Sequence, residues 1–478
     1  MVWPAGNQKV GSQLKMMMRR GTIVFLLAIG QACASYHQTN RDFNLEFEQG
    51  QLQAALATLR NSNIKNSRNE FLYYVNGGLV LSMMGRYAES NDYLEKAYLL
   101  GEDFRTNYFL QAASYLTNPI VTEYRGEDHE HLMLLYYKAI NFLKEGRTEE
   151  ALVECRRLNI RLQQLSDRYE NPDRYREDAF VHMLMGIIYD MDRDYNNAFI
   201  AYRNSYEIYT SSYARLFQVA VPQQLKQDLL RTASLSGFTD ELARFKAEFN
   251  VPHYVYQPDQ NGQLIFFWHN GLSPIKSEWG INFIADTRND FIYFSNEEMN
   301  FVFPFPLNNY SQEDRNALTA LRVFRVAFPR FVERPEYFQS GQLIWNNQRT
   351  ELEVCQNIQR IATHCLQQRM TLEFSKALIR VALKKAVEHQ ARKSDRVLGS
   401  VVGVVNALTE RADVRSWQTL PHNIHIAKIS LPPGRHQVRL ELAGSRTDQQ
   451  HDFTYEVQSG QTLFHTFTSL ETNYPRYY

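Results

Sequence analysis

The chain has 478 residues, enough for two or more domains with a large buried core. Lysine plus arginine and aspartate plus glutamate are equal at 52 each, so the formal net charge is zero. Nucleic-acid-binding proteins usually carry a basic excess, so this balance argues against that class of partner. Aromatic residues make up 13% of the chain, a composition that suits binding grooves and interfaces as well as cores.

Residues 1–33 carry the pattern of a bacterial export signal. Arg19 and Arg20 precede about nine mostly apolar residues, and Ala32 and Cys33 follow them, which is typical of a lipoprotein signal. The apolar run is shorter than the roughly 18 residues that a transmembrane helix requires. Cleavage before Cys33 would make this thiol the lipidated N-terminus. The alternative is cleavage after Ala34, which gives a soluble periplasmic protein.

Three further expectations concern this region. The residues before Met16 are more than an ordinary signal needs, so we expect translation to begin at Met16, Met17 or Met18. Residues 34–43 are polar and predict a flexible tether that spans roughly 20 Å. Ala34, in place of an aspartate, favours the outer membrane over the inner membrane for a lipidated protein.

Residues 44–247 have helical periodicity with a repeated turn. Four turn positions each precede a small residue by five places: Gly50 and Ala55, Gly85 and Ser90, Gly146 and Ala151, and Arg193 and Ala198. In a tetratricopeptide repeat, this turn joins two paired helices, and the small residue allows their close approach. The spacings are 35, 61 and 47 residues against about 34 in that repeat, so residues 101–128 and 165–178 interrupt the array. An irregular helical bundle is the alternative.

Residues 252–478 change to short aromatic and β-branched segments. Strands are predicted over 263–268, 281–285 and 291–294, helix over 353–412, and alternating strands around 438–442 and 453–457. The predicted fold class is α+β and multidomain. A tetratricopeptide-like α-solenoid is followed by a C-terminal α+β domain with a β-sandwich-like sheet.

Seven segments of the chain together form a distinctive pattern: Leu116–Pro119, Tyr124–Glu130, Tyr137–Ala139, Ala151–Asn159, Asn270–Lys276, Leu408–Pro421 and Leu431–Gly434. They resemble a family of poorly characterised bacterial cell-envelope lipoproteins with tetratricopeptide-like helices. The string from Asp413 to Pro421 is the most specific. His129 and Cys155 occupy positions where the family more often has an aromatic and a small residue. The resemblance implies an envelope lipoprotein, often encoded near an activator of cell-wall synthesis, and it implies no catalytic residues.

The chain offers little that indicates catalysis, a cofactor or a metal ion. Zinc-protease, phosphate-binding-loop, dinucleotide-binding and serine-hydrolase motifs do not occur in the sequence. His129 and His131 flank Glu130, but side chains two apart on a helix point in nearly opposite directions. Glu127, Asp128 and Glu130 are better explained as an acidic helix N-terminus. We therefore expect no catalytic, cofactor-binding or metal-binding residues.

Cysteine usage adds one expectation. Cys155 lies on the apolar stripe of a predicted helix, and Cys355 and Cys365 are ten residues apart. On one helix, this spacing places them about 15 Å apart, too far for a disulfide, although a bend between them could permit one. Packing in the core is therefore the expected role of all three.

Two charged clusters are candidate partner-binding sites. The insertion cluster is predicted to line the inner face of the solenoid, where its arginines could bind a carboxylate: Tyr124, Arg125, Glu127, Glu130, Arg156, Arg157 and Asn159. The alternative is that Arg156 and Arg157 pair with acids of residues 123–130 and hold the insertion in place. The Asp413 cluster comprises Asp413, Arg415 and Trp417, for which the alternative is an internal ion pair beside a buried indole.

The function expected from these observations is that of a non-enzymatic, membrane-anchored scaffold in the bacterial cell envelope. Its partners would be other envelope proteins, including cell-wall synthesis factors, and its place the periplasmic side of the outer membrane. One alternative is a module that recognises peptidoglycan or another glycan through the aromatic-rich C-terminal domain. A second is an envelope hydrolase.

Overall fold

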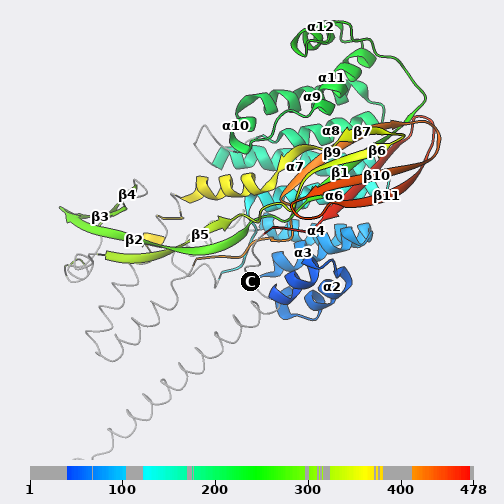
Figure 1. Cartoon of the computed structure of the whole chain (residues 1–478). Helices are drawn as coiled ribbons and strands as arrows, with labels where there is room; N and C mark the ends of the chain where they lie inside the picture. Colours follow the sequence, from blue (N-terminus) through cyan, green and yellow to red (C-terminus); the bar gives the residue numbers. More distant parts are fainter. Residues whose placement is uncertain are drawn as a thin grey trace, which may run out of the picture.

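The computed structural model describes residues 40–66, 68–103, 122–168, 175, 177–296, 301–308, 312, 315, 323–370, 373–374, 377–379 and 412–473. The predicted export signal and Cys33 lie outside these ranges. Helices occupy the N-terminal half and strands most of the C-terminal half, so the protein is an α+β multidomain protein (Figure 1). Within the described ranges, no helix combines the length and the apolar character that crossing a bilayer requires.

The helices form antiparallel pairs. Residues 40–48 are helical and pair with α2 (Leu52–Arg60). The later pairs are α3 (Glu70–Met83) with α4 (Tyr87–Asp103), α6 (Asp128–Lys144) with α7 (Thr148–Arg168), α8 (Ala179–Met191) with α9 (Tyr195–Ile208), and α11 (Gln223–Ser236) with α12 (Thr239–Glu248). Short helical turns complete the array: η1 (Asn63–Asn66), η4 (Tyr209–Tyr213) and α10 (Ala214–Phe217).

The four predicted turns are confirmed. Gly50, Gly85, Gly146 and Arg193 have φ between 61° and 75°, the left-handed conformation that ends a helix and that glycine adopts without steric cost. The small residue five places later is fully buried in each case. A fifth turn of the same conformation, at Gly237 between α11 and α12, was not predicted. The N-terminal region is therefore a tetratricopeptide-like helical array with an irregular repeat length.

Two four-stranded sheets form a β-sandwich. The first has the order β12–β1–β9–β8 and the second the order β11–β10–β6–β7. The strands of the first sheet are β1 (Gly262–Asn270), β8 (Glu353–Asn357), β9 (Asn423–Leu431) and β12 (Thr462–Ser469). Those of the second are β6 (Phe338–Trp345), β7 (Gln348–Glu351), β10 (Gly434–Gly444) and β11 (Gln449–Val457).

Strand β1 is buried on both faces and explains how the helices and the sandwich join. Its residues Leu264, Phe266 and Trp268 pack between the two sheets, in one core with Leu440 and Val438. The alternate residues Ile265 and Phe267 pack against the helices. Because neighbouring residues of a strand point to opposite faces, this strand reads as a continuous apolar run. The result is three layers: the helices pack against the first sheet, and the other face of that sheet packs against the second sheet.

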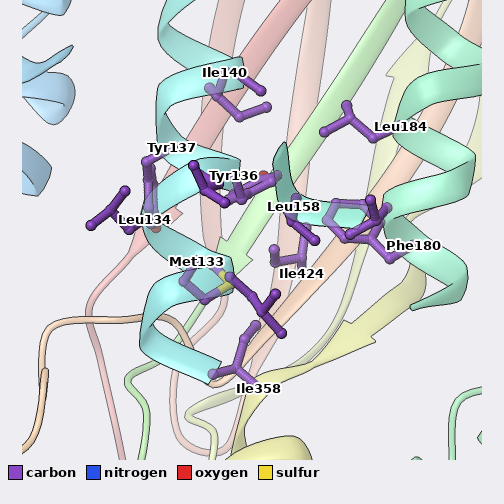
Figure 2. Packing of buried hydrophobic residues seen from close by; sticks show 14 of the residues in the cluster. Met133, Leu134, Tyr136, Tyr137, Ile140, Leu158, Phe180, Leu184, Ile358 and Ile424 are labelled. Carbon is purple, nitrogen blue, oxygen red and sulfur yellow. The ribbon is translucent and has the colours of Figure 1, made fainter. Parts of the chain in front are cut away.

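The first helix of several pairs contacts the β1–β9 sheet. On α6, Tyr136 Oη lies 2.8 Å from His269 Nε2 of β1, and on α8 the rings of Phe180 and Phe267 have centroids 5.7 Å apart. On α11, Asp228 accepts a 2.7 Å hydrogen bond from Lys428 of β9. Figure 2 shows side chains of α6 and α8 beside Ile424 of β9. We call this face, formed by α3, α6, α8 and α11, the inner face, and the exposed face of α4, α7 and α9 the outer face.

A third sheet extends away from the sandwich (Figure 1). It has the order β4–β3–β2–β5 and comprises β2 (Ile275–Arg288), β3 (Phe291–Asn296), β4 (Phe301–Pro306) and β5 (Val323–Val332). One face of this sheet carries Phe283, Ile292 and Phe328, which pack in a separate small core with Phe374 and Leu378.

The C-terminal half also corrects part of the sequence interpretation. Residues 353–357 were expected to be helical, but they form β8, and the helix begins at residue 358. Pairing of β8 with β9, in which Glu353 faces Ile426, fixes this segment as a strand, and the local pattern contains no sign of that contact. Strands β4, β5, β6, β7, β9 and β12 were not predicted either.

The cysteines of the described residues are free and buried. Cys155 lies on α7, Cys355 on β8 and Cys365 on the helix of residues 358–370. Burial raises the pKa of the Cys355 thiol well above its usual value, so the thiol stays protonated and unreactive. The expected packing role of the three cysteines is confirmed.

Candidate functional site

Parts of the two predicted clusters meet at one place, although their residues are up to 293 positions apart. The backbone N–H of Trp417 donates to Glu130 Oε1 at 2.6 Å, and the Tyr124 hydroxyl donates to Glu130 Oε2 at 2.8 Å. The guanidinium of Arg415 lies 5.1 Å from the centroid of the Tyr124 ring. We call this region, which also includes Glu127 and Asp413, the junction.

Local sequence explains why the chain turns into α6 here. Gly126 has φ of 84°, and a Cβ at this position would lie 2.5 Å from Phe71 Cζ, so glycine is required on both counts. Glu127 and Glu130 then form a capping box, in which the side chain of each residue accepts a hydrogen bond from the backbone N–H of the other. The interpretation of these acids as a helix N-terminus is confirmed.

Glu127 holds the third sheet to the helices through two ion pairs. Its carboxylate pairs with Lys276 of β2 and with Arg369 of the helix of residues 358–370. Burial disfavours a charge on Glu127, but the two cations outweigh that effect and hold its pKa far below the usual value. Lys276 is equally buried. A buried carboxylate with two cationic partners is costly to disturb, because removing either partner leaves a charge without compensation.

Glu130, three residues away, has the opposite titration behaviour. It is fully buried, and burial together with the negative charge of Glu127 raises its pKa to about 7. Its hydrogen bonds from Trp417, Glu127 and Tyr124 favour the ionised form and limit the rise. Glu127 and Glu130 therefore differ in their charge near neutral pH: Glu127 stays ionised, whereas Glu130 titrates in that range.

The Asp413 cluster forms the internal ion pair that the sequence interpretation offered as an alternative. Arg415 binds Asp413 through two hydrogen bonds of 2.8 and 2.7 Å, and it also donates to Asn69 and to the carbonyl of Thr122 at 3.0 Å. The indole of Trp417 is buried against Tyr137, with ring centroids 6.1 Å apart. These residues tie the segment that precedes β9 to the inner face.

A cavity of about 210 Å³ opens at the junction between segment 122–127, the third sheet and the helical residues Arg369, Glu373 and Ala377. Its apolar wall includes Phe328, Pro329 and Ala377. Its charged lining carries both signs, and it comprises Arg125, Lys276 and Arg369 with Glu123, Glu127, Glu373 and Asp413. Lys276, Arg369 and Glu373 were not among the predicted site residues. A lysine beside Ile275 in an apolar strand was a usable signal, whereas the sequence around Arg369 and Glu373 gave none.

The remaining residues of the insertion cluster lie elsewhere, on α7. Arg157 pairs with Glu95 at 3.1 Å and with Glu154 at 3.3 Å, while Arg156 is exposed and donates to the hydroxyl of Tyr189 at 3.3 Å. Asn159 is half-buried. The expected pairing of these arginines with residues 123–130 is corrected, because carboxylates of α4 and α7 lie within reach of Arg157.

The predicted position of the insertion cluster on an open inner face is also corrected. Tyr124, Glu127 and Glu130 are at most 6% exposed, because the chain's own β2 and the segment before β9 cover them. His129 and His131 are buried as well, and burial lowers the pKa of His129 to about 4. The inner face is therefore largely an intramolecular interface.

Comparison with known proteins yields distant structural similarity. No protein-family model and no curated protein matches the chain. The chain is similar to the crystal structure of BtubC (BKLC) from P. vanneervenii, with 13% identity, a TM-score of 0.29, and coverage of 54% of this chain and 96% of that one. It is also similar to MamA, with 11% identity, a TM-score of 0.28, and coverage of 47% and 98%. At such scores, the description of the helical repeats rests on their own turn geometry and buried small residues.

Proposed function

We propose that this protein is a non-enzymatic scaffold of the bacterial cell envelope. A lipid on Cys33 anchors it to the outer membrane on the periplasmic side, and the folded part binds another envelope protein. The export-signal pattern before Cys33 and the resemblance to envelope lipoproteins support this location. The tetratricopeptide-like array supports a role in protein binding, since stacked helical repeats present extended surfaces.

The observation that carries the proposal is the contrast between the two faces of the array. The inner face is covered by the chain's own strands, so a partner has access to the outer face. On α7, Val153 and Ile160 are 43% and 53% exposed, and the exposed Arg156 lies between them in sequence. Spacings of three and four residues place these side chains on one face of the helix. Leu99 of α4 and Ile200 of α9 are exposed on neighbouring second helices.

This α7 stripe, defined as Val153, Arg156 and Ile160, fits a partner segment that presents apolar side chains and a carboxylate. The two aliphatic residues provide apolar area, and the guanidinium of Arg156 can bind a carboxylate through two hydrogen bonds. Arg157 is a poorer candidate, because Glu95 and Glu154 already bind it.

The test is crosslinking in living cells, followed by affinity purification and mass spectrometry. Ile160→Glu and Arg156→Glu should each remove one dominant envelope protein from the crosslinked products while the protein remains folded. Val255→Glu and Arg435→Glu are matched controls, because both residues are exposed and lie outside the helical pairs. Loss of the same partner in the controls, or retention in both α7 variants, contradicts the proposal.

The proposed anchor has a separate test. Cells that express the wild type should incorporate labelled palmitate into the protein, and Cys33→Ser should abolish that label and release the protein from the membrane fraction. A wild-type protein without label overturns the anchor while leaving the scaffold proposal open to the crosslinking test.

The structure gives less support to recognition of a glycan by exposed aromatic rings. On β10, the exposed side chains include Arg435, Gln437 and Arg439, whereas Val438, Leu440 and Leu442 are buried. The aromatic residues Phe453 and Tyr455 of β11 pack against the core between the two sheets. Retention of the purified protein by cell-wall sacculi, with no dominant protein partner, would reverse this preference.

A further inference from the structure

We infer that the free edge of β12 binds an extended segment of a partner protein, which adds to the first sheet as a further strand. The segment has apolar side chains on one face, and polar side chains with a carboxylate on the other. The inference goes beyond the proposed scaffold function, because this edge lies in the sheet and the α7 stripe lies on the outer face of the helices. It also holds for any location of the protein.

The backbone of β12 presents a row of hydrogen-bonding groups to a new strand. In the described part of the chain, β12 is the last strand of its sheet and pairs only with β1. The N–H of Gln263 donates to the carbonyl of Gln461 at 2.8 Å, so Gln461 and every second residue after it direct their backbone groups to β1. The residues between them direct their N–H and C=O groups to the free edge: Thr462, Phe464, Thr466 and Thr468.

β12 differs from the other described edge strands in having none of the features that protect an edge. Proteins protect edge strands by keeping them short or by placing charges, prolines and bulges on them. β7 has four residues, β8 has five and an irregular register, β11 carries Asp452, β4 carries Pro304, and β5 carries Pro329. β12 has eight residues without proline, glycine, lysine, arginine, aspartate or glutamate. His465 adds no charge near neutral pH, because burial and the nearby Lys144 lower its pKa to about 3.

The side of β12 that faces the second sheet favours apolar side chains in the added strand. Leu463 and Phe467 are half-buried there and pack against the core between the two sheets. The ring of Phe453 on β11 has its centroid 6.0 Å from that of Phe467, so β11 lies over this side of the edge. Because side chains alternate between the faces of a strand, every second side chain of the added strand would cover these groups. Apolar side chains at those positions would bury further area and lose no hydrogen bonds to water.

The side of β12 that faces the helices favours polar side chains and a carboxylate. Besides Phe464 it carries threonines, which can form hydrogen bonds across neighbouring strands. Nζ of Lys144, the last residue of α6, lies 5.8 Å from the centroid of the Phe464 ring. Burial lowers the pKa of Lys144 to about 8, and no carboxylate of the described residues pairs with this lysine. A half-buried cation without an anionic partner would be stabilised by a carboxylate of the added strand.

The experiment measures binding of a defined peptide to the full mature protein by fluorescence anisotropy. The probe is a fluorescein-labelled heptapeptide in which four valines alternate with threonine, glutamate and threonine. The matched control peptide has lysine in place of the glutamate. We expect the acidic peptide to bind, and the lysine peptide to bind at least about tenfold more weakly, because it places a second cation beside Lys144. Absence of binding by the acidic peptide, or equal binding of the two peptides, overturns the inference.

Substitutions at Thr466 test whether the peptide binds to the backbone of this edge. Thr466→Pro removes an N–H from the free edge and leaves the hydrogen bonds to β1 in place, and proline is tolerated at such positions. It should weaken binding of the acidic peptide at least about tenfold, because a carbonyl of the peptide loses its donor. Thr466→Val is the matched control, since it keeps the N–H and the shape of the side chain and should bind within about threefold of the wild type. Equal binding by the proline and valine variants overturns the assignment of this edge.

Hydrogen exchange keeps the test decisive if circular dichroism shows that Thr466→Pro does not fold. In the wild type, the acidic peptide should slow exchange of the Phe464 and Thr466 amides, and unchanged exchange there overturns the inference. Ile160→Glu on α7 should leave peptide binding unchanged, so this test and the crosslinking test can fail separately. Sedimentation of the free protein distinguishes a partner segment from a second copy of the chain. A dimer that Thr466→Pro converts into a monomer would mean that β12 pairs with itself, which overturns the assignment of the occupant.

Discussion

The two faces of the helical array differ in what covers them. On the inner face, Trp417 of the segment before β9 donates to Glu130 of α6, and Lys428 of β9 donates to Asp228 of α11, so parts far apart in the sequence are joined. On the outer face, α7 exposes Val153 and Ile160 to solvent. A helical repeat is usually expected to bind partners along its inner surface, but here the chain itself fills much of that surface. The comparison teaches that a repeat motif identifies the scaffold and leaves open which of its faces is available.

The largest contrast should come from removing one large side chain on each face. Trp417→Ala deletes an indole that is 1% exposed, and we expect the free energy of unfolding to fall by about 3–5 kcal/mol. Ile160→Ala on the outer face should change it by no more than about 0.5 kcal/mol, because the side chain is already half exposed. Urea unfolding followed by circular dichroism measures both. Equal effects in the two variants would mean that the faces are not energetically distinct.

A similar contrast should hold for charge. Glu127→Ala removes the shared partner of Lys276 and Arg369 at the junction, and we expect a loss of about 3–5 kcal/mol in the free energy of unfolding. Glu150→Ala, on α7, breaks an exposed ion pair with Arg147 and should leave that free energy unchanged within error. Urea unfolding of the Glu127→Ala and Glu150→Ala variants measures both effects. A stable Glu127→Ala protein would show that the junction does not depend on its buried ion pairs.

The titration of Glu130 sharpens the comparison, because it concerns the inner face alone. Its pKa of about 7 in the folded protein lies above the usual 4.5, so the folded state binds the proton more tightly than the unfolded state does. The contribution of Glu130 to stability is therefore greatest below about pH 4.5, falls as the pH rises to about 7, and is constant above that.

Glu130→Gln removes this dependence. Relative to the wild type, the variant should gain up to roughly 3 kcal/mol in free energy of unfolding between pH 4.5 and pH 8. Urea titrations of both proteins at those two pH values give the difference directly. A difference that does not change with pH would show that Glu130 titrates at its ordinary pKa in the folded protein.

The helical turns could be predicted from sequence because their rules are local. The sequence signal is a turn residue, glycine in three of the four turns, with a small residue five places later. In the structure, the turn residue has a positive φ and the small residue is buried, and even Arg193 and Ala198 follow this pattern. The junction could be predicted only in pieces. The sequence indicated an Asp413–Arg415 pair and an acidic helix N-terminus, but it did not indicate that they meet, since the hydrogen bond from Trp417 to Glu130 spans 287 residues. Lys276 and Arg369 likewise reach the junction through contacts with Glu127, which lies far from both in the sequence.

The smallest predicted effects separate a local turn from the inner face. Gly126 and Gly146 both have positive φ, so alanine at either position is strained by about 1 kcal/mol. A Cβ at Gly146 would meet nothing within 4 Å, whereas a Cβ at Gly126 would lie 2.5 Å from Phe71, which is buried and cannot easily move. We therefore expect Gly126→Ala to lower the free energy of unfolding by about 1–3 kcal/mol more than Gly146→Ala. Urea unfolding could instead give the same loss of free energy for both variants. The strain would then come from the backbone turn alone, and the contact of residue 126 with Phe71 of α3 would add nothing to it.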